Sequence, residues 1–290
     1  MNLNKSNIKD IFYILPSFIF ITVFFFYPIG YIFGISFLEW NGISQNKSFI
    51  GLDNYKNFFT DPIAMKSLGN QILWGIITIL SQMFLGLTMA ILLRSQAKFK
   101  IFYKLIFFLP NIISVAVVAY VFNKIYDNNF GELNYFLDSI KLNFLQHPWL
   151  GDPDTALYCL MIANIWQWTG FSFLLYHAGM TQINEELYES ARIDGANIFN
   201  IVRNIIIPLL KPTHIALLIL GVIGTLKTFD IIYLTTGGGP ARSTEFLSTY
   251  IFQKGILEFK ASYASTMALM IVLIALVITV LQVKVYNRRG

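Results

Sequence analysis

The chain has 290 residues, of which 56% are hydrophobic and only 13% are charged. Ordinary soluble domains carry about 25% charged residues, so a soluble protein of this length could not bury this much apolar surface. The net charge of +5 comes from basic residues in short clusters between apolar runs, which favours orientation in a membrane over binding of nucleic acid.

Stretches with at most one charged residue occur six times along the chain. A helix needs about 20 mostly apolar residues to cross a hydrocarbon core of about 30 Å. Each stretch is expected to be helical, because lipid offers no partner for free backbone polar groups. The fifth is the weakest, since Lys211 interrupts it. The six stretches cover residues 11–38, 67–93, 105–123, 155–184, 204–226 and 261–283.

The distribution of charge between these stretches predicts their orientation. Loop 127–154 holds five acids and one lysine, whereas loop 94–104 and the C-terminal tail hold bases and no acid. Short loops rich in Lys and Arg stay in the cytoplasm. We therefore predict an all-α membrane protein with six transmembrane helices and both termini cytoplasmic. The abundance of Ile, Asn, Lys and Phe hints at an A/T-rich bacterial genome and hence at a bacterial plasma or inner membrane. The bases of the first loop are Arg94, Lys98, Lys100 and Lys104.

The sequence carries no recognisable catalytic chemistry. It has no Walker A pattern, so ATP cannot bind to a P-loop in this chain. The three histidines lack metal-site spacing, and Cys159 is the single cysteine, which excludes an internal disulfide and a cysteine-based metal site. We expect no catalytic residue, no metal and no cofactor in this chain.

Residues 184–208 are expected to form two short helices with a sharp break. Asn184 is a good N-cap, followed by two glutamates that suit the positive end of a helix. Glu189 and Arg192 are spaced to form an ion pair on the first helix. Asp194 and Gly195 then break the helix, because glycine tolerates positive φ. On this pattern alone, the segment is equally compatible with a plain capped loop.

The same segment resembles the EAA motif of binding-protein-dependent ABC importer permeases. This resemblance implies a type I importer permease architecture, with the loop docking into an ATPase subunit. The implied partners are an ATPase dimer that binds ATP and Mg, a second homologous permease, an extracellular or periplasmic solute-binding protein and the lipid membrane; no nucleic acid is implied. The implied coupling residues are Glu189, Ala191, Asp194, Gly195, Ala196, Ile205 and Pro208.

Two further segments resemble sugar permeases of the maltose and glycerol-3-phosphate type. They are Phe229 to Pro240, with its run of three glycines, and Gly51-Leu52-x-Asn54-Tyr55. The likeness covers about residues 11–286 and implies import of a sugar or sugar-like solute, using ATP hydrolysed by the partner. The domain division that follows is an N-terminal helix with an external loop, 1–66, and a permease core, 67–286, with the coupling loop at 184–208.

The fourth apolar stretch has an unusual group of polar and aromatic residues at its middle. Asn164 and Trp168 share one helical face, and Phe171 lies close to it. Sugars are held by aromatic faces and hydrogen-bonding side chains, so these three residues are candidates for the substrate route. Packing between helices is the alternative, and it is the stronger one for Gln71, Trp74 and Gln82 in the second stretch.

Three other functions remain as alternatives. A permease for a non-sugar solute would have the same architecture. A secondary transporter would need acids within its membrane helices and repeated halves, and the sequence has neither. A membrane enzyme or a receptor would need catalytic residues or a soluble domain.

Overall fold

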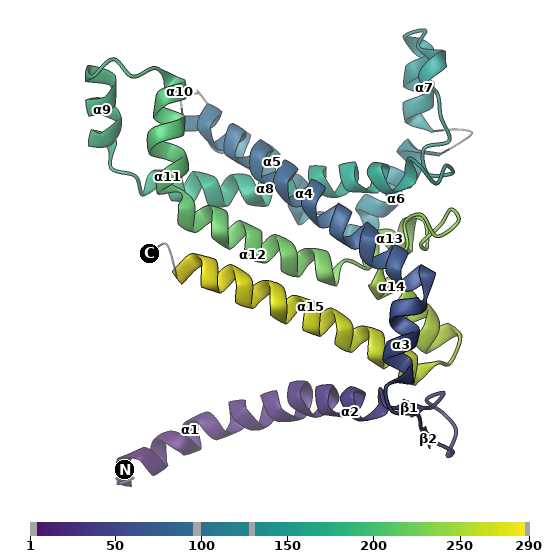
Figure 1. Ribbon diagram of the computed structural model, residues 1–290. Coiled ribbons are helices and arrows are strands. Elements are labelled where there is room, and N and C mark those ends of the chain that lie inside the picture. Colours follow the sequence, from purple (N-terminus) through teal and green to yellow (C-terminus); the bar gives the residue numbers. More distant parts are fainter. Residues whose placement is uncertain (1–4, 95–99, 128–130, 288–290) are drawn as a thin grey trace. The chain divides into compact units, whose positions relative to one another are not determined.

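The computed structural model describes residues 5–94, 100–127 and 131–287 (Figure 1). Contacts divide the chain into two compact units, each made of two segments. Unit 1 comprises residues 1–62 and 250–273, and unit 2 comprises residues 63–249 and 274–290. The sequence predicted a different boundary, between residues 66 and 67, which separates the N-terminal helix and its loop from the permease core. That boundary stays a prediction.

Unit 1 begins with a long apolar helix and ends with the start of another. Its successive elements are α1 (Lys5–Ile21), η1 (Thr22–Phe26), α2 (Tyr27–Ile35), β1 (Leu38–Glu39), β2 (Ser48–Phe49), α3 (Asp53–Thr60), part of α14 (Leu247–Phe252), η4 (Gln253–Leu257) and part of α15 (Ala261–Asn287). β1 and β2 pair antiparallel, Leu38 opposite Phe49.

The motif Gly51-Leu52-x-Asn54-Tyr55 ties helix α3 to the end of α2. The amide of Asn54 is buried and donates to the carbonyls of Ser36 and Leu38, both at 2.9 Å. The hydroxyls of Tyr55 and Ser36 lie 2.8 Å apart. Gly51 has a φ of +59°, a conformation in which a residue with a Cβ is strained. These residues therefore satisfy the carbonyls left free where α2 ends.

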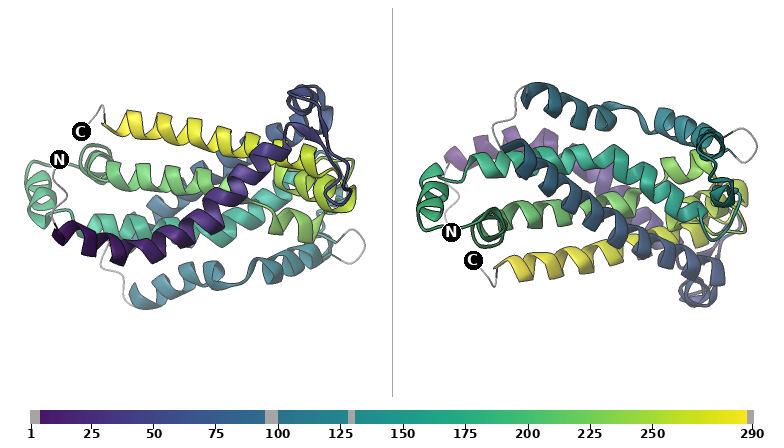
Figure 2. Two further views of the ribbon diagram at one scale, coloured as in Figure 1. Left: turned by 90° about the horizontal axis from the view of Figure 1, so that it is seen from below. Right: turned by 90° about the horizontal axis from the view of Figure 1, so that it is seen from above.

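Unit 2 is a helical bundle. Its elements are α4 (Pro62–Arg94), α5 (Lys100–Ile112), α6 (Val115–Ile125), α7 (Glu132–Ser139), η2 (Asn143–Leu145), α8 (Ala156–Thr181), α9 (Glu185–Ile193), α10 (Ile198–Ile201), η3 (Val202–Ile206), α11 (Ile207–Leu209), α12 (Lys211–Lys227), α13 (Asp230–Thr235), the start of α14 and the end of α15. Helices α4, α8 and α12 run lengthwise together, with α9 and α10 at one end and α7 and α13 at the other (Figures 1 and 2).

The number of membrane spans is three to five by length and composition in the described residues. Three helices qualify alone, and two bent helix pairs add one span each if each pair is counted as one. Helix α8 has 26 residues and no charge, but its polar middle keeps it outside this count. The prediction of several membrane-spanning helices is confirmed, and the number six stays a prediction. The qualifying segments are Tyr13–Ile35, Pro62–Leu93, Ala261–Gln282, Ile101–Ile112 with Val115–Ile125, and Ile198–Leu209 with Lys211–Lys227.

The span expected over 105–123 is a pair of helices bent by 92° at residues 113 and 114. The Ser114 hydroxyl caps α6 by accepting from the Val117 amide at 3.4 Å. The carbonyl of Ile113 accepts from Nε2 of Gln167, in α8, at 3.0 Å. The second bent pair turns by 65° at Leu210, and α12 begins at Lys211 with Pro212 in its first turn, where proline is tolerated.

The basic residues that predicted the orientation lie largely outside the described part. Lys98, Arg288 and Arg289 are not described, and of Arg94 and Lys100 only the backbone is. The cytoplasmic position of both termini is therefore untested by the structure.

Two apolar clusters form the core of unit 2. One surrounds Trp74, which meets Phe246 edge to face at 5.3 Å between ring centroids. The other surrounds Phe173 and Tyr176 of α8 and reaches Tyr188 in α9. Close helix contact depends on glycine: a Cβ on Gly170 would overlap the Phe107 carbonyl oxygen of α5. This contact fixes α5 against α8.

We expect Gly170→Ala to destabilise the protein by about 1–3 kcal/mol, the usual cost of inserting an atom into a packed interior. The measurement is the thermal melting temperature of the purified protein in detergent. Gly69→Ala in α4 is the control, because a Cβ there has nothing within 4 Å. Equal melting temperatures for both variants would contradict the close contact.

Candidate functional site

A cavity of about 420 Å³ lies within unit 2 among helices α4, α6, α8, α12 and α13. All three route candidates from the sequence, Asn164, Trp168 and Phe171, line it. The Trp168 ring is 39% exposed and meets Phe171 edge to face at 6.3 Å. An aromatic pair and an amide therefore share one wall of the cavity.

The side-chain amides of Gln82 and Gln71, both in α4, make different contacts. Nε2 of Gln82 donates to Oδ1 of Asn164 at 2.9 Å, so α4 orients the Asn164 amide. Nε2 of Gln71 donates to the carbonyl of Thr225 at 3.0 Å and joins α4 to the end of α12. The packing interpretation is thus confirmed for Gln71, which does not line the cavity, while Gln82 both packs and lines it.

Two charged residues at the cavity were missed as site candidates. Lys227 ends α12 and Asp230 begins α13, and both line the cavity. The sequence placed them near the end of a span but assigned them no role. The break between the two helices brings them there, and the nearby Phe229-Asp230 motif was the signal that could have revealed it.

The glycine-rich run 237–239 is folded around a buried acid of the same loop. Glu245 has a side chain only 2% exposed, and its Oε2 lies 2.7 Å from a guanidinium nitrogen of Arg242. Gly238 has a φ of +93°, and a Cβ on it would come within 2.5 Å of Oε2 of Glu245. The Asn70 amide donates to the carbonyls of Ser243 and Glu245 at 2.9 and 3.0 Å. Glycine is needed here for both conformation and space.

Residues 184–208, here called the coupling segment, form two short helices joined by a tight turn. Asn184 caps α9 by accepting from the Glu186 amide at 3.2 Å. At the other end, the Ala196 amide donates to the Ala191 carbonyl at 2.9 Å, and the Gly195 amide donates to the Arg192 carbonyl at 3.1 Å. These two bonds, with Gly195 at φ +79°, form a Schellman motif. The bend expected at Gly195 is present.

Small and aromatic residues hold the coupling segment against its own bundle. Tyr188 is 2% exposed, and Ala191, Ala196 and Ile205 pack partly buried against the same cluster. A Cβ on Gly195 would have nothing within 4 Å, so the constraint there is conformational, not steric, within this chain. Pro208 is exposed and lies in the first turn of α11. Tyr188, the main anchor, was missed by the sequence analysis, although its aromatic character was the available signal.

The opposite face of the coupling segment exposes apolar side chains. Ile193 is 86% exposed, Ile198 67% and Phe199 65%. Glu189 and Asp194 are also exposed, and in the described part of the chain Glu189 makes no ion pair with Arg192, contrary to the expected pairing. Large apolar side chains displayed in this way beside an unpaired acid are typical of a protein-binding surface.

Comparisons with known proteins agree on one family. Residues 82–289 match the model for a binding-protein-dependent transport system inner membrane component. The probable ABC transporter permease protein YurN of Bacillus subtilis is 33% identical, with 98% of each chain covered. The trehalose/maltose transport system permease protein MalF of Thermococcus litoralis is 33% identical, with 82% of this chain and 80% of the relative covered.

A solved structure shares the fold. It is a bacterial ABC transporter involved in the import of the acidic polysaccharide alginate, one chain of which matches with a TM-score of 0.84 and 24% identity. The match covers 98% of this chain and 99% of the other. At this identity the likeness establishes the permease fold and leaves the solute open.

Proposed function

We propose that this chain, which belongs to the family of binding-protein-dependent transport system inner membrane components, is the membrane-spanning permease subunit of an ATP-driven sugar importer. The observation that carries the proposal is the likeness to sugar permeases along most of the chain, including the trehalose/maltose permease. The chain supplies a solute route and a coupling surface.

The energy for import comes from a partner in this proposal. A dimeric ATPase binds ATP and Mg, a second, similar permease completes the membrane pore, and a solute-binding protein delivers the sugar. The exposed apolar face of the coupling segment supports this assignment, because Ile193, Ile198 and Phe199 suit a hydrophobic groove on a partner. Glu189 lies on the same exposed segment and is available for a basic residue of the ATPase.

The central cavity is the proposed route for the sugar. The Trp168 and Phe171 rings offer apolar faces, and Asn164 offers an amide whose carbonyl oxygen is already oriented by Gln82. This combination suits a solute with apolar ring faces and hydroxyl edges. In this proposal the second permease forms the opposite wall of the route.

The proposed topology has six spans with both termini in the cytoplasm of a bacterium. Helix α8 is the sixth span in this proposal. Its 26 residues are enough to cross a membrane, and the polar residues that lower its mean hydropathy face a cavity or neighbouring helices. The coupling segment then lies on the cytoplasmic side, beside the ATPase, and α7 and the glycine-rich turn lie outside.

Gly195→Val should reduce co-purification of the ATPase and abolish most of the uptake. A side chain at this positive φ costs about 1–2 kcal/mol and deforms the turn that positions the exposed face. Glu189→Lys should do the same by charge reversal, worth about 1.5–3 kcal/mol if the partner group is shielded from water. Asp138→Lys in α7 is the matched control. Normal ATPase binding and normal uptake by both variants would reduce the coupling segment to a plain connector.

Trp168→Ala should lower sugar uptake by about two- to tenfold while leaving assembly with the partners intact, because it removes one stacking face. The measurement is uptake of labelled maltose or trehalose by the reconstituted importer. Trp166→Ala is the control, since Trp166 belongs to the same helix, is 44% exposed and does not line the cavity. If the two variants transport alike, Trp168 has a packing role.

Cysteine introduced at Ile140 should react with a membrane-impermeant maleimide added to intact cells. Ile140 is 47% exposed and follows α7, on the proposed outer side. The native Cys159 is buried, so a Cys159→Ala background gives a clean signal. Labelling only after cell disruption would overturn the topology.

A further inference from the structure

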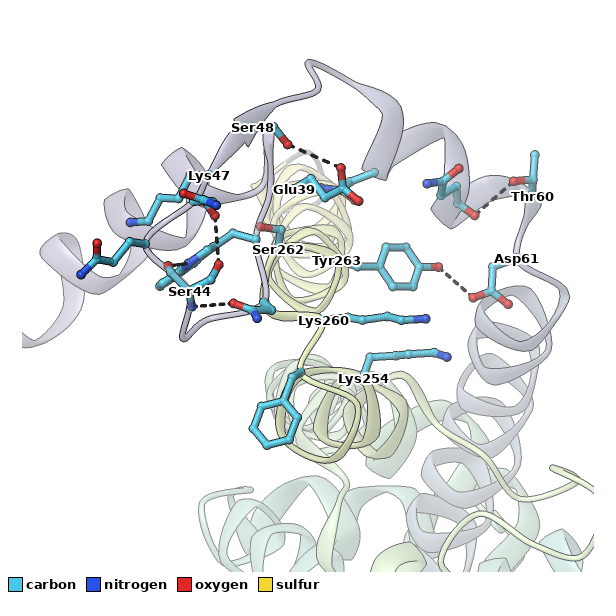
Figure 3. Close-up of a pocket in the computed structure, with 17 residues that line it drawn as sticks. Glu39, Ser44, Lys47, Ser48, Thr60, Asp61, Lys254, Lys260, Ser262 and Tyr263 are labelled. Atoms are coloured by element: carbon cyan, nitrogen blue, oxygen red, sulfur yellow. Dashed lines mark hydrogen bonds between the residues drawn. The ribbon is translucent and has the colours of Figure 1, made fainter.

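Unit 1 contains a polar pocket that is separate from the central cavity. Its volume is about 1050 Å³, at the upper end of the roughly 300–1,000 Å³ of small-molecule sites. The β1–β2 loop forms one side, the end of α3 forms another, and η4 with the start of α15 forms the floor (Figure 3). From this floor, Lys254, Lys260 and Tyr263 extend in parallel towards Asp61 (Figure 3).

The walls of the pocket are fixed by hydrogen bonds. Trp40 donates from its indole nitrogen to the Ser44 carbonyl at 2.7 Å, and its backbone carbonyl accepts from the Ser262 amide at 3.2 Å. Oδ2 of Asp61 accepts from the hydroxyls of Tyr263 and Tyr250 at 2.9 and 2.7 Å. The loop, α15 and α3 therefore form a built site and not a chance gap between mobile side chains.

One buried polar group at this pocket has no partner. The Ser262 side chain lines the pocket and the residue is only 3% exposed. Among the described residues its hydroxyl makes no hydrogen bond. Because the hydroxyl oxygen is itself buried, it lies beneath the pocket surface and is not a contact for a bound solute.

The charges around the pocket are nearly balanced. Glu258, just outside it, lies 2.7 Å from Lys254 and 3.6 Å from Lys260. The hydrogen bond from Lys254 lowers the pKa of the Glu258 carboxyl, so this acid stays charged at neutral pH. Glu258 offsets one of these two lysines, and Glu39 and Asp61 offset the other one and Lys47. A balanced, hydroxyl- and amide-rich lining favours an uncharged polar solute over an ion.

Phe259, at the rim of the pocket, is held in an unfavourable conformation. It has a φ of +53° and follows Glu258, the C-cap of η4, at a position where glycine is the usual residue. Its side chain is nevertheless 53% exposed and lines the pocket. Backbone strain retained to display an aromatic ring is typical of a functional position.

We propose that this pocket of unit 1 binds an uncharged saccharide, with the Phe259 ring as its aromatic face and the amides of Asn46 and Asn57 among its hydrogen-bonding groups. In this proposal the solute binds first at this pocket, on the outer side of the membrane, and the central cavity is a second, different site. The proposal rests on the proposed sugar-import function, and its failure is distinguishable from failure of that function.

The first test uses a thiol probe in the assembled importer with Cys159→Ala. Asn46→Cys lies in the pocket lining, whereas Phe49→Cys is exposed in the same hairpin and outside the lining. The probe sugar is whichever of maltose, trehalose, maltotriose and lactose the importer takes up. We expect this sugar to slow maleimide labelling of Asn46→Cys at least about threefold and to leave Phe49→Cys unchanged.

The second test separates binding from folding. Phe259→Gly should raise the Kd for the same sugar, measured by calorimetry without the binding protein, by about two- to tenfold. It should also raise the melting temperature, because glycine relieves the strained φ. Phe49→Ala should change neither. A purely structural role for Phe259 predicts no change in Kd.

Three results would overturn this site. One is uptake of the sugar without protection of Asn46→Cys. Another is protection by the sugar-free solute-binding protein and not by the sugar, which would make the pocket a protein-docking surface. The third is loss of the partner permease in Phe259→Gly, which would make Phe259 a subunit contact. Uptake of none of the sugars would instead refute the proposed import function.

Discussion

Helix breaks and ends leave backbone carbonyls without partners, and each such group costs several kcal/mol when it is buried without a hydrogen bond. The rest of this structure depends on how those carbonyls are satisfied. Buried amide side chains supply the partners: Gln167 bonds the carbonyl at the α5–α6 break and Gln71 bonds the end of α12. Asn54 does the same at the end of α2, and Asn70 within the glycine-rich turn. These four amides provide hydrogen-bond partners at the points where the helices break or end.

The bends in turn create the sites. The α12–α13 break places Lys227 and Asp230 at the central cavity, and the Schellman turn at Gly195 sets α9 apart from α10. Both lie in unit 2, and α8 contributes to each: its middle lines the cavity and its end packs with Tyr188. One helix, α8, therefore contributes both to the lining of the cavity and to the packing of the coupling segment.

The sequence predicted features that depend on local chemistry. These features are the apolar stretches, the capped bend at Gly195 and the helical face with Asn164, Trp168 and Phe171. They could be predicted because helical spacing and glycine conformation depend on only a few neighbouring residues. Features that depend on distant partners were not. Gln71 looked like a route residue or a packing residue until its acceptor, a carbonyl more than 150 positions away, was known. The buried state of Glu245, the anchoring by Tyr188 and the strained φ of Phe259 likewise come from tertiary contacts.

Helix α8 runs for 26 residues, which at 1.5 Å per residue is about 39 Å. It has no proline, and the close contact at Gly170 leaves it little freedom to flex in its middle. A helix of this kind moves as a rod, so any displacement at Trp168 is passed to Met180 without being absorbed between them. Motions of whole packed helices occur in microseconds to milliseconds. A displacement of α8 as a whole is therefore orders of magnitude slower than the flip of an exposed side chain along the cavity.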